Sequence, residues 1–488
     1  MTTLIPEWLG QRAALTPNRT ALSFEGKAWT FAELDRWAEG IAEGLRLRGV
    51  RPGDRVALLA DNSAAFAAVV HAVPRTGSIL LLLNSRLTAT ELAWQLTDCR
   101  ASLVIGDERN QVAALRAADE ARVRSASLDD LGGREAGRAA PPRQIDLDAV
   151  HSIVYTSGTT GRPKGALLTF GNQTWSALGS LVNLGLQSDD CWLACLPLFH
   201  VGGLAILIRG AIYGIRTAIL RQFEPAAVNA AIDRDRVSIV SAVAIMLQRM
   251  LDARDDRPFP ATLRGVLLGG GPAPRDLLER ATRIGVPVIQ TYGLTETASQ
   301  VTTLAPEDAL VRLGSAGKPL FPTEVRIVDT NGQSLPPGAG GEIVVRGPTV
   351  SPGYFGSPAR PAEEWLHTGD IGILDRDGYL TVLDRRDDLI VTGGENVYPA
   401  EVEAALRTHP LVEDAGVAGV SDADWGQRVI AFVVPSPGAT VDIGALVDFC
   451  RQRLAGYKAP REIRIVEDLP RNAAGKLLRS ELRRRMEP

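Results

Sequence analysis

The chain has 488 residues, 45% of them hydrophobic and 23% charged, which is enough for more than one globular domain. Its 53 basic and 57 acidic residues leave a net charge of −4, so nucleic acid and anionic membranes are not indicated as partners. The cysteines are scattered and contain no Cys-x-x-Cys pair, which argues against a zinc site or a disulfide framework. We interpret them as reduced, buried thiols of a cytoplasmic protein. They are Cys99, Cys191, Cys195 and Cys450.

Neither the start of the chain nor its apolar stretch predicts contact with a membrane. Residues 1–10 lack a basic region followed by an apolar run, so no signal peptide is expected. Residues 192–215 are mostly apolar but include Pro197, His200 and Arg209, which a lipid-facing helix would tolerate poorly. We therefore expect this stretch to be buried protein core.

The pattern of residues in the first two thirds of the chain predicts alternating strands and helices. Residues 109–142 have weak apolar periodicity and are predicted to form a variable surface region. A short buried strand is expected at 150–155, followed by a loop of small residues and a helix from about Asn172. Later strand-like runs cover residues 237–243, 265–268 and 286–289. This alternation predicts mixed α/β layers.

After about residue 314 the pattern changes to hairpins. Strand-like runs are separated by two turns, Asn331-Gly332 and residues 376–378. The runs cover residues 324–329, 342–347, 371–375 and 379–384. We expect antiparallel sheet here. Beyond residue 384 we expect a compact α/β unit of about a hundred residues. One of its helices should begin at Pro399 and end before Pro410.

Residues 155–165, Tyr-Thr-Ser-Gly-Thr-Thr-Gly-Arg-Pro-Lys-Gly, form the most informative segment. Small residues let the backbone fold around phosphate oxygens, hydroxyl and amide groups donate hydrogen bonds, and the lysine adds charge. A P-loop nucleotide hydrolase requires Ser or Thr directly after the lysine, whereas Gly165 follows Lys164 here. The P-loop is thereby excluded. A glycine loop without function stays the alternative on this segment alone.

The segment resembles the signature loop of the adenylate-forming superfamily of acyl-CoA synthetases, luciferases and peptide-synthetase adenylation domains. Other motifs resembling that superfamily follow in order: residues 292–296 (YGLTE), 368–370 (TGD), 384–387 (DRRD), 393–396 (GGEN) and 470–476 (PRNAAGK). The resemblance runs from Trp8 to about Arg479. It implies an α/β fold with a large N-terminal domain of layered α/β subdomains plus antiparallel sheet, residues 1–386. A small mobile α+β C-terminal domain would follow, residues 387–488.

The same resemblance implies that a carboxylate attacks the α-phosphate of ATP and pyrophosphate leaves. The phosphates would be held by Thr156, Ser157, Gly158, Thr159, Thr160 and Lys164. Thr295 would contact the α-phosphate. Glu296 would supply a carboxylate to Mg²⁺, which usually takes one or two carboxylates together with substrate phosphates. The alternative for Glu296 is a surface ion pair.

The adenosine part of ATP would occupy a second group of residues. These are Gly269, Gly270, Gly271, Pro272, Tyr292, Gly293, Asp370 and Arg385. The three glycines would let the adenine ring lie on the backbone, although an ordinary strand-to-helix turn is the alternative. The Asp370 carboxylate can accept from both ribose hydroxyls. Arg385 would donate to the ribose or to a phosphate.

The implied second step transfers the acyl group to coenzyme A after the C-terminal domain rotates. Lys476 would bridge the α-phosphate and the carboxylate during adenylation, with a solvated lysine of a basic tail as the alternative. Asp387 matches the hinge, and a hinge residue need not be small. After rotation, Gly393, Gly394 and Glu395 would face the thiol of coenzyme A.

His200 matches the aromatic gate beside the acyl site of this superfamily, with a buried core histidine as the alternative. Four segments resemble o-succinylbenzoate–CoA ligases of menaquinone biosynthesis: residues 196–204, 268–274, 299–300 and 313–321. That substrate has two carboxylates, of which the succinyl one is activated and the aromatic one is only recognised.

Arg209 is isolated in an apolar run, and an uncompensated guanidinium there would cost several kcal/mol. We expect it to bind the aromatic carboxylate, with a buried structural ion pair or a helix-end arginine as the alternative. Ser241 should line the same pocket. Ala244 departs from that family's pattern, where a longer polar side chain is expected. A ligase for another small or aromatic acid, or an enzyme that loads a carrier protein, stays open. A homodimer is possible.

Overall fold

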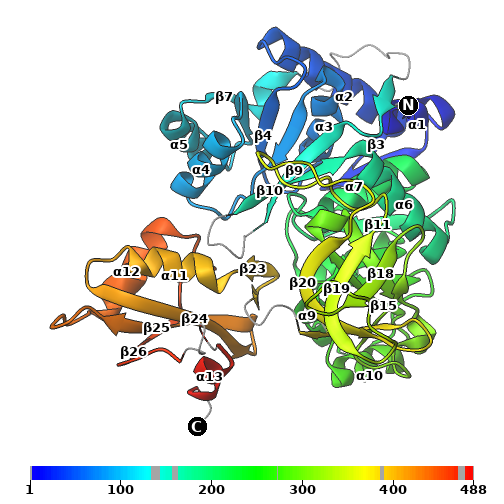
Figure 1. Ribbon diagram of the computed structural model, residues 1–488. Helices are drawn as coiled ribbons and strands as arrows, with labels where there is room; N and C mark the ends of the chain where they lie inside the picture. Colours follow the sequence, from blue (N-terminus) through cyan, green and yellow to red (C-terminus); the bar gives the residue numbers. More distant parts are fainter. Residues whose placement is uncertain are drawn as a thin grey trace.

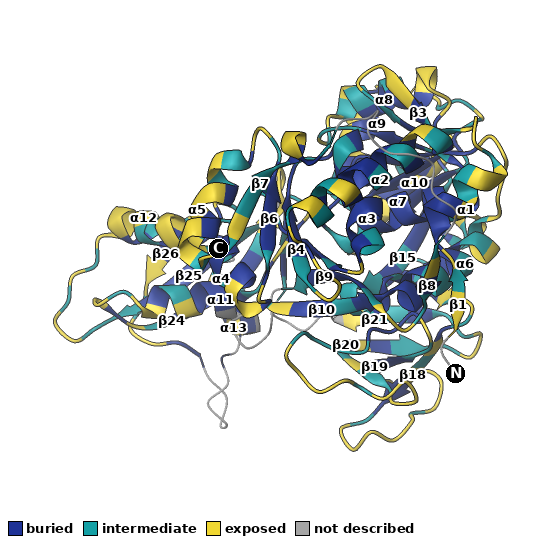
Figure 2. Cartoon of the chain, turned by 90° about the horizontal axis from the view of Figure 1, so that it is seen from above, coloured by how far each residue is buried: buried dark blue, intermediate teal, exposed yellow. Residues whose placement is uncertain are grey.

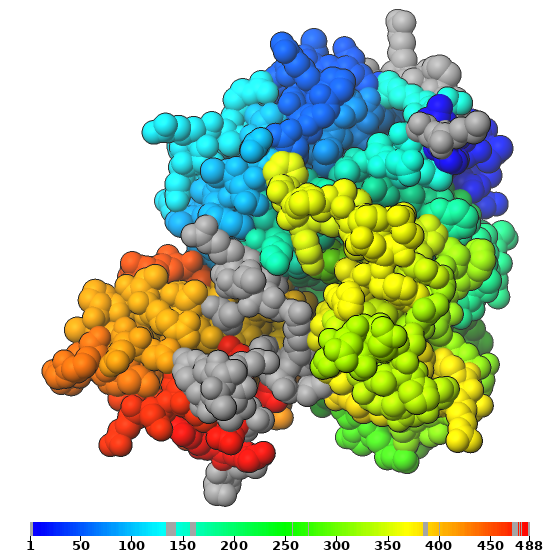
Figure 3. All heavy atoms as spheres, viewed as in Figure 1, coloured from blue at the N-terminus to red at the C-terminus, as the bar shows by residue number. Residues whose placement is uncertain are grey.

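The computed structural model describes residues 3–132, 143–156, 163–255, 257–271, 273–384, 389–470, 477 and 479–486. The chain forms a large N-terminal domain and a smaller C-terminal domain (Figure 1). In the space-filling view the residues after 390, in orange and red, form a separate lobe beside the rest of the chain (Figure 3). The α/β class expected from the sequence is confirmed.

A six-stranded sheet begins the N-terminal domain, with four parallel strand pairs and one antiparallel pair. Its order is β10 (Lys164–Thr169), β9 (Val150–Thr156), β5 (Ile79–Leu82), β4 (Arg55–Leu59), β6 (Leu103–Gly106) and β7 (Arg124–Ser127). Helices α2 (Phe31–Leu47) and α3 (Ala64–Ala72) cover one face, and α4 (Ala89–Asp98) and α5 (Gln111–Ala121) cover the other. Since side chains alternate along β4, Val56 and Leu58 join one core while Ala57 and Leu59 join the other.

The prediction of a surface region at residues 109–142 is wrong for its first part. Residues 111–121 form α5, and residues 124–127 form the edge strand β7. Helix α5 buries only alanines, Ala114, Ala117 and Ala118, against the sheet. Such small side chains give a weak apolar pattern, which explains why the periodicity was missed.

A second sheet of thirteen strands fills the rest of the domain. Its parallel centre contains β15 (Val288–Leu294), β14 (Gly265–Leu268), β13 (Ile239–Ala242), β11 (Cys191–Ala194), β12 (Arg216–Ile219) and β2 (Thr20–Phe24). Strand β3 (Lys27–Thr30) closes one end. Helices α6 (Phe170–Leu184) and α7 (Val201–Tyr213) pack on one face. Helices α8 (Pro225–Arg234), α9 (Ala244–Asp252) and α10 (Arg275–Arg283) pack on the other.

The apolar stretch at residues 192–215 is buried core, as expected. Strand β11 is buried along its whole length because helices cover both faces of the sheet. Helix α7 is apolar on most sides because it lies between that sheet and α6. Within the described residues, no helix has the length and apolar character needed to cross a membrane.

The antiparallel strands expected after residue 314 are present at the other end of the large sheet. The predicted runs correspond to β18 (Glu324–Val328), β19 (Gly340–Arg346), β20 (Leu366–Leu374) and β21 (Leu380–Asp384). Two strands that were not predicted, β16 (Ser299–Leu304) and β17 (Ser315–Pro319), connect them to β15 in the sheet. Strands β18 and β19 pair antiparallel, as do β20 and β21. The left-handed φ of Gly332, 76°, fits the expected turn between β18 and β19.

The C-terminal domain is built on a separate five-stranded sheet. Its strands are β22 (Ile390–Thr392), β23 (Glu395–Val397), β24 (Val412–Asp422), β25 (Gly426–Pro435) and β26 (Glu462–Ile465). Helices α11 (Pro399–Arg407) and α12 (Ile443–Arg453) pack on one face, and α13 (Arg479–Arg484) packs on the other. The expected helix start at Pro399 is confirmed, and the helix ends before Pro410 as expected.

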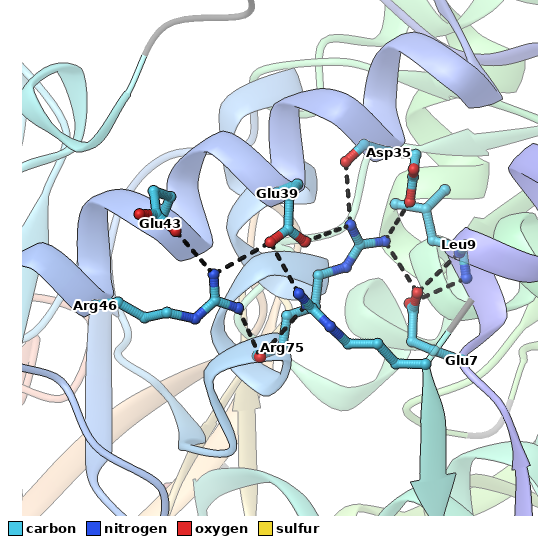
Figure 4. Close-up of polar contacts among 9 residues, drawn as sticks. Glu7, Leu9, Asp35, Glu39, Glu43, Arg46 and Arg75 are labelled. Atoms are coloured by element: carbon cyan, nitrogen blue, oxygen red, sulfur yellow. Dashed lines mark hydrogen bonds and ion pairs between the residues drawn. The ribbon is translucent and has the colours of Figure 1, made fainter. Parts of the chain in front are cut away.

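A buried charge network fixes the first helix, α1 (Trp8–Leu15), on the domain. The Arg75 side chain, 4% exposed, contacts carboxylates of Glu7 at 2.9 Å and Asp35 at 2.5 Å (Figure 4). Helix α1 then places Arg12, whose Nη2 donates to the carbonyl of Ile212 at 2.7 Å. This contact binds the last turn of α7, where carbonyl groups lack partners within the helix.

Buried residues concentrate in the sheets and the helix faces that cover them (Figure 2). The four cysteines are free and buried, as the sequence indicated. A short pair of strands, β1 (Leu4–Pro6) and β8 (Gln144–Asp146), joins the start of the chain to the segment before β9.

Candidate active site

A cavity of about 470 Å³ lies where the two large sheets and the C-terminal domain meet. Most of the predicted site residues that are described line it. They are Thr156, Lys164, His200, Arg209, Ser241, Gly269, Gly270, Gly293, Thr295, Glu296, Asp370, Gly394 and Glu395. Gly271, Tyr292 and Gly393 adjoin these residues in the chain but do not line the cavity. Residues that are far apart in the sequence are thus brought to one place.

Eight predicted site residues lie outside the described residues. They are Ser157, Gly158, Thr159, Thr160, Pro272, Arg385, Asp387 and Lys476.

The predicted phosphate residues meet a carboxylate at one end of the cavity. Thr156 and Lys164 are register partners at the ends of β9 and β10. The Glu296 carboxylate accepts a hydrogen bond from the Tyr354 hydroxyl at 2.7 Å and a long one from Thr156 Oγ1 at 3.4 Å. The Lys164 ammonium lies 5.4 Å from the centre of the Tyr354 ring. A cation, a hydroxyl and a carboxylate therefore share one small region.

The predicted nucleoside residues cluster around the end of β15. The Tyr292 hydroxyl donates to Asp370 Oδ2 at 2.7 Å, which fixes one oxygen of a carboxylate that is 6% exposed. A Cβ atom on Gly293 would lie 1.6 Å from the carbonyl oxygen of Ser299, so no other residue fits there. Gly270 has a φ of +81°. Glycine suits such a backbone conformation at low energetic cost.

His200 precedes α7 and contacts a carboxylate from the C-terminal domain. Its Nε2 lies 3.0 Å from Glu395 Oε2, and Arg86 Nη1 donates to Glu395 Oε1 at 2.7 Å. Asn84 adds a donor at 3.2 Å. Burial opposes ionisation of Glu395, but His200, Arg86 and Asn84 outweigh it and hold the pKa of this carboxyl below its ordinary value. Glu395 is therefore a charged group that joins the two domains.

Gly393 and Gly394 form the tight turn that presents Glu395. Both have left-handed φ values, +57° and +83°. A Cβ atom on Gly393 would lie 2.7 Å from the Trp425 ring. The turn therefore depends on glycine, and it brings Gly394 and Glu395 to the cavity.

Arg209 lies in the cavity wall with its guanidinium almost unpaired. The residue is 2% exposed, stands 5.3 Å from the Trp192 ring, and donates to Ser176 Oγ at a long 3.3 Å. Its Nε has no hydrogen-bond partner in the part of the chain that the structure describes. Among the described residues, no carboxylate lies within ion-pair distance of it. Burial lowers the pKa of this guanidinium, and nearby Tyr213 opposes the shift.

Ser241 supports the same wall, since its hydroxyl accepts from Trp192 Nε1 at 3.0 Å. Ala244 begins α9 and is partly buried. The structure thus brings Arg209 and Ser241 together through Trp192, as contacts of one wall.

Family comparison agrees with this geometry. Residues 9–355 match the AMP-binding enzyme family, and residues 401–476 match the AMP-binding enzyme C-terminal domain. The chain belongs to the AMP-binding enzyme family. The resemblance drawn from the motifs is thereby confirmed.

Within this family the proteins similar to this chain include 2-succinylbenzoate–CoA ligases. It is 51% identical over 486 residues to 2-succinylbenzoate–CoA ligase of Geobacillus kaustophilus, covering 99% of this chain and 98% of the relative. It is 42% identical, with a TM-score of 0.91, to a double mutant of o-succinylbenzoate CoA synthetase from Bacillus subtilis bound with the product analogue OSB-NCoA. The same Bacillus enzyme in complex with the acyl-adenylate OSB-AMP gives 43% identity and a TM-score of 0.76. Each of these two matches covers 98% of both chains.

The donors around Glu296 fit a magnesium ion held mainly by nucleotide. Among the described residues, no group of three or more histidine, cysteine, aspartate or glutamate side chains could hold a metal by itself. Mg²⁺ usually binds one or two carboxylates and completes its shell with phosphates and water. A single carboxylate beside Thr156 and Lys164 suits that chemistry.

Several residues that shape the site were not predicted from the sequence. Tyr354, Asn84, Arg86 and Tyr457 are far from the recognised motifs in the chain, and their side chains reach the cavity or its carboxylates only in the folded structure. Trp192 was visible only as an apolar residue of a buried run. Its position beside Arg209 follows from the packing of β11 on α7.

Proposed function

We propose that this chain is an o-succinylbenzoate–CoA ligase. In the first step, the succinyl carboxylate oxygen forms a bond to the α-phosphorus of ATP and pyrophosphate leaves. In the second, the sulfur of coenzyme A forms a bond to the acyl carbon, its proton is lost, and AMP leaves. The observation that carries the substrate assignment is the buried Arg209 guanidinium, which has no described carboxylate partner within the cavity.

For the first step, Thr156, Lys164 and Thr295 bind the phosphates from the rim of the cavity. The hydroxyls and glycine amides of residues 157–160 belong to the same loop, and Lys476 bridges the α-phosphate and the substrate carboxylate. Glu296 holds Mg²⁺, which supplies charge neutralisation to the phosphates when bound. Fixed donors aimed at oxygens that gain charge account for much of such catalysis.

The adenosine is held by Asp370 at the ribose and by Gly269 and Gly270 beneath the adenine. Tyr292 acts behind Asp370, since its hydroxyl donates to one carboxylate oxygen and so fixes the orientation of that carboxylate. Gly271, Pro272, Gly293 and Arg385 complete the nucleotide site. With these assignments, the nucleotide site and the acyl pocket are parts of one cavity.

The second step uses another orientation of the C-terminal domain. We place the boundary between residues 386 and 387, with Asp387 as hinge. Two features support assigning the described orientation to thioester formation: Glu395 already lies at the cavity, and the overall similarity is greater to the product-analogue complex than to the adenylate complex. Both comparisons have nearly the same sequence identity, so divergence in sequence does not account for the difference in TM-score.

The acyl pocket recognises the aromatic carboxylate by charge. Arg209 offers guanidinium hydrogens that few described groups satisfy, and Trp192 holds the guanidinium plane from one side. A substrate carboxylate would supply the missing partner, with bidentate hydrogen bonds if both oxygens face the fork. His200 stands at the domain boundary, where its Nε2 contacts Glu395.

The decisive experiment measures pyrophosphate release for a panel of acids with and without coenzyme A. o-Succinylbenzoate should give both pyrophosphate and a coenzyme A thioester identified by mass. The analogue 4-oxo-4-phenylbutanoate, which lacks only the aromatic carboxylate, should be a poor substrate. Efficient turnover of the analogue would identify this chain as a ligase for another small or aromatic acid. A preference for an unrelated acid over o-succinylbenzoate would lead to the same conclusion. Transfer to a carrier protein but not to coenzyme A would identify an enzyme that loads carriers.

As an o-succinylbenzoate–CoA ligase, the protein would work in menaquinone biosynthesis in the cytoplasm, and we propose a homodimer. The sequence's charge balance supports partners that are small molecules, and its apolar stretch is buried core. Sedimentation of the purified protein measures its oligomeric state.

A further inference from the structure

A buried lysine, Lys458, makes a second contact between the two domains, in addition to the contact made by Glu395. Lys458 lies in the C-terminal domain, and its Nζ is 2.8 Å from Glu91 Oε1 of the N-terminal domain. The same Nζ is 2.7 Å from Glu401 Oε1 in α11 of its own domain. The Lys458 side chain is 4% exposed, Glu91 12% and Glu401 9%. One ammonium is thus shared by two carboxylates inside the domain boundary.

The local charges favour this contact. Burial disfavours the charged form of Lys458, but Glu401 and Glu91 outweigh burial and raise the pKa of the ammonium above its ordinary value. Its charge is therefore fully present at neutral pH. Removing one member of a buried pair leaves the other charge desolvated, which makes such contacts strong determinants of geometry.

Glu91 is held rigidly on the N-terminal side. Its Oε2 accepts from the backbone N–H and the hydroxyl of Thr88, both at 2.8 Å, and forms the capping box at the start of α4. Its Oε1 is thereby aimed at Lys458. The segment just before α4 carries Asn84 and Arg86, which bind Glu395. The ion pair consequently fixes the position of the C-terminal domain relative to this segment.

The neighbouring residue links the pair to the cavity. Tyr457 precedes Lys458, lines the cavity, and accepts a hydrogen bond from Asn84 Nδ2 at 3.3 Å through its hydroxyl oxygen. A shift of Lys458 by the length of one hydrogen bond would therefore displace a wall residue. A displacement of about 1 Å at a reacting site can lower a rate about a hundredfold.

The contact is also built to open. When the domains separate, Lys458 keeps Glu401 as its partner, because both belong to the C-terminal domain. Glu91 keeps its two hydrogen bonds from Thr88. Neither charge is left buried without a partner, so the contact stabilises the docked orientation without blocking its release.

We propose that Glu91 and Lys458 are positioning residues for acyl transfer to coenzyme A. They act by docking the C-terminal domain, without touching the reacting atoms. The proposal rests on the proposed function, because it assigns the described orientation to the second half-reaction. It predicts that the pair is required for thioester formation and dispensable for adenylation.

The test measures the two half-reactions separately in Glu91→Gln. Glutamine at this position keeps a capping box but removes the charge that faces Lys458. Thioester formation from supplied o-succinylbenzoyl-adenylate and coenzyme A should slow by about tenfold or more, which is about 1.4 kcal/mol. Pyrophosphate release from ATP and o-succinylbenzoate should stay within about twofold of wild type.

Glu33→Gln is the matched control. Glu33 forms the same capping box with Thr30 at the start of α2, and it is exposed and far from the C-terminal domain. This variant should leave both half-reactions unchanged. A loss equal to that of Glu91→Gln would attribute the effect to helix capping and overturn the proposal.

A double-mutant cycle with Lys458→Met completes the test. The thioester rate of Glu91→Gln/Lys458→Met should be less damaged than the sum of the two single effects, because both remove one contact. Additive effects, or equal losses in both half-reactions, contradict a docking pair. The wild-type protein tests the proposed function, which fails if wild type forms no thioester from the adenylate. If wild type is active and Glu91→Gln is unimpaired, only the docking pair is refuted.

Discussion

Replacing Arg209 with methionine should weaken substrate binding while leaving the fold at least as stable. Methionine retains an unbranched apolar side chain that can fill the same space beside Trp192. The guanidinium that it removes is 2% exposed, makes one long hydrogen bond, and has an Nε without a partner. The free protein therefore carries a poorly compensated buried charge at this position.

The structure sets the magnitudes of the two effects. Replacing buried ionic groups by apolar residues is neutral or stabilising by about 1–4 kcal/mol, so the Tm of Arg209→Met should equal or exceed that of wild type. Loss of a charged partner from a desolvated pair costs about 2–5 kcal/mol. Some of this is recovered by solvent, so we expect the KM for o-succinylbenzoate to rise by at least about tenfold, or about 1.4 kcal/mol.

The assay compares o-succinylbenzoate with 4-oxo-4-phenylbutanoate in both proteins. Wild type should prefer the diacid strongly, and Arg209→Met should lose little further activity with the analogue. KM for ATP should barely change, because the proposed phosphate residues, Thr156 and Lys164, belong to β9 and β10, whereas Arg209 belongs to α7. A variant that melts at lower temperature and is equally impaired with both acids would show that Arg209 supports the fold, and the reasoning from its unpaired guanidinium would be refuted.

Three further perturbations test the remaining assignments. Lys476→Ala should lower adenylate formation by about a hundredfold or more while sparing thioester formation from supplied adenylate; equal loss in both steps would contradict its role. Asp387→Pro fixes φ near −65° and should permit pyrophosphate release while thioester production collapses; an unchanged thioester rate would exclude it as hinge. His151 is buried, which together with the nearby His71 lowers its pKa to about 3. It stays neutral in the fold while the unfolded chain takes up a proton below about pH 6.5, so stability falls as pH drops through that window. His151→Leu should therefore show a smaller decrease in Tm between about pH 7 and about pH 5, and an unchanged decrease would argue against this origin.

Local chemistry allowed much of the site to be predicted from the sequence. The strand before the glycine loop was predicted at residues 150–155 and is found at Val150–Thr156. The helix start at Pro399 and the hairpins after residue 314 follow from proline and turn residues that act over short distances. Arg209 was identified because a charge in an apolar run is conspicuous without any knowledge of the fold.

The residues that escaped prediction depend on contacts across the chain. Tyr354 binds Glu296 from 58 positions away, and Arg86 binds Glu395 from 309 positions away. Nothing near Lys458 in sequence indicates Glu91, since 367 positions separate them. Helix α5 was missed for a different reason, because its buried face consists of alanines. Apolar periodicity detects large side chains, whereas close packing can be achieved with small ones.

The carboxylate of Glu395 has a consequence for the sequence of events during turnover. It lies at the cavity, 3.0 Å from His200, in the docked orientation of the C-terminal domain described above. Its charge is paired there with Arg86 at 2.7 Å, so one ion pair joins the two domains. If the C-terminal domain rotates between the two half-reactions, as proposed, this ion pair would break and form again in every turnover. The docked orientation would then be less favoured at high salt, to the extent that solvent reaches the half-exposed Arg86.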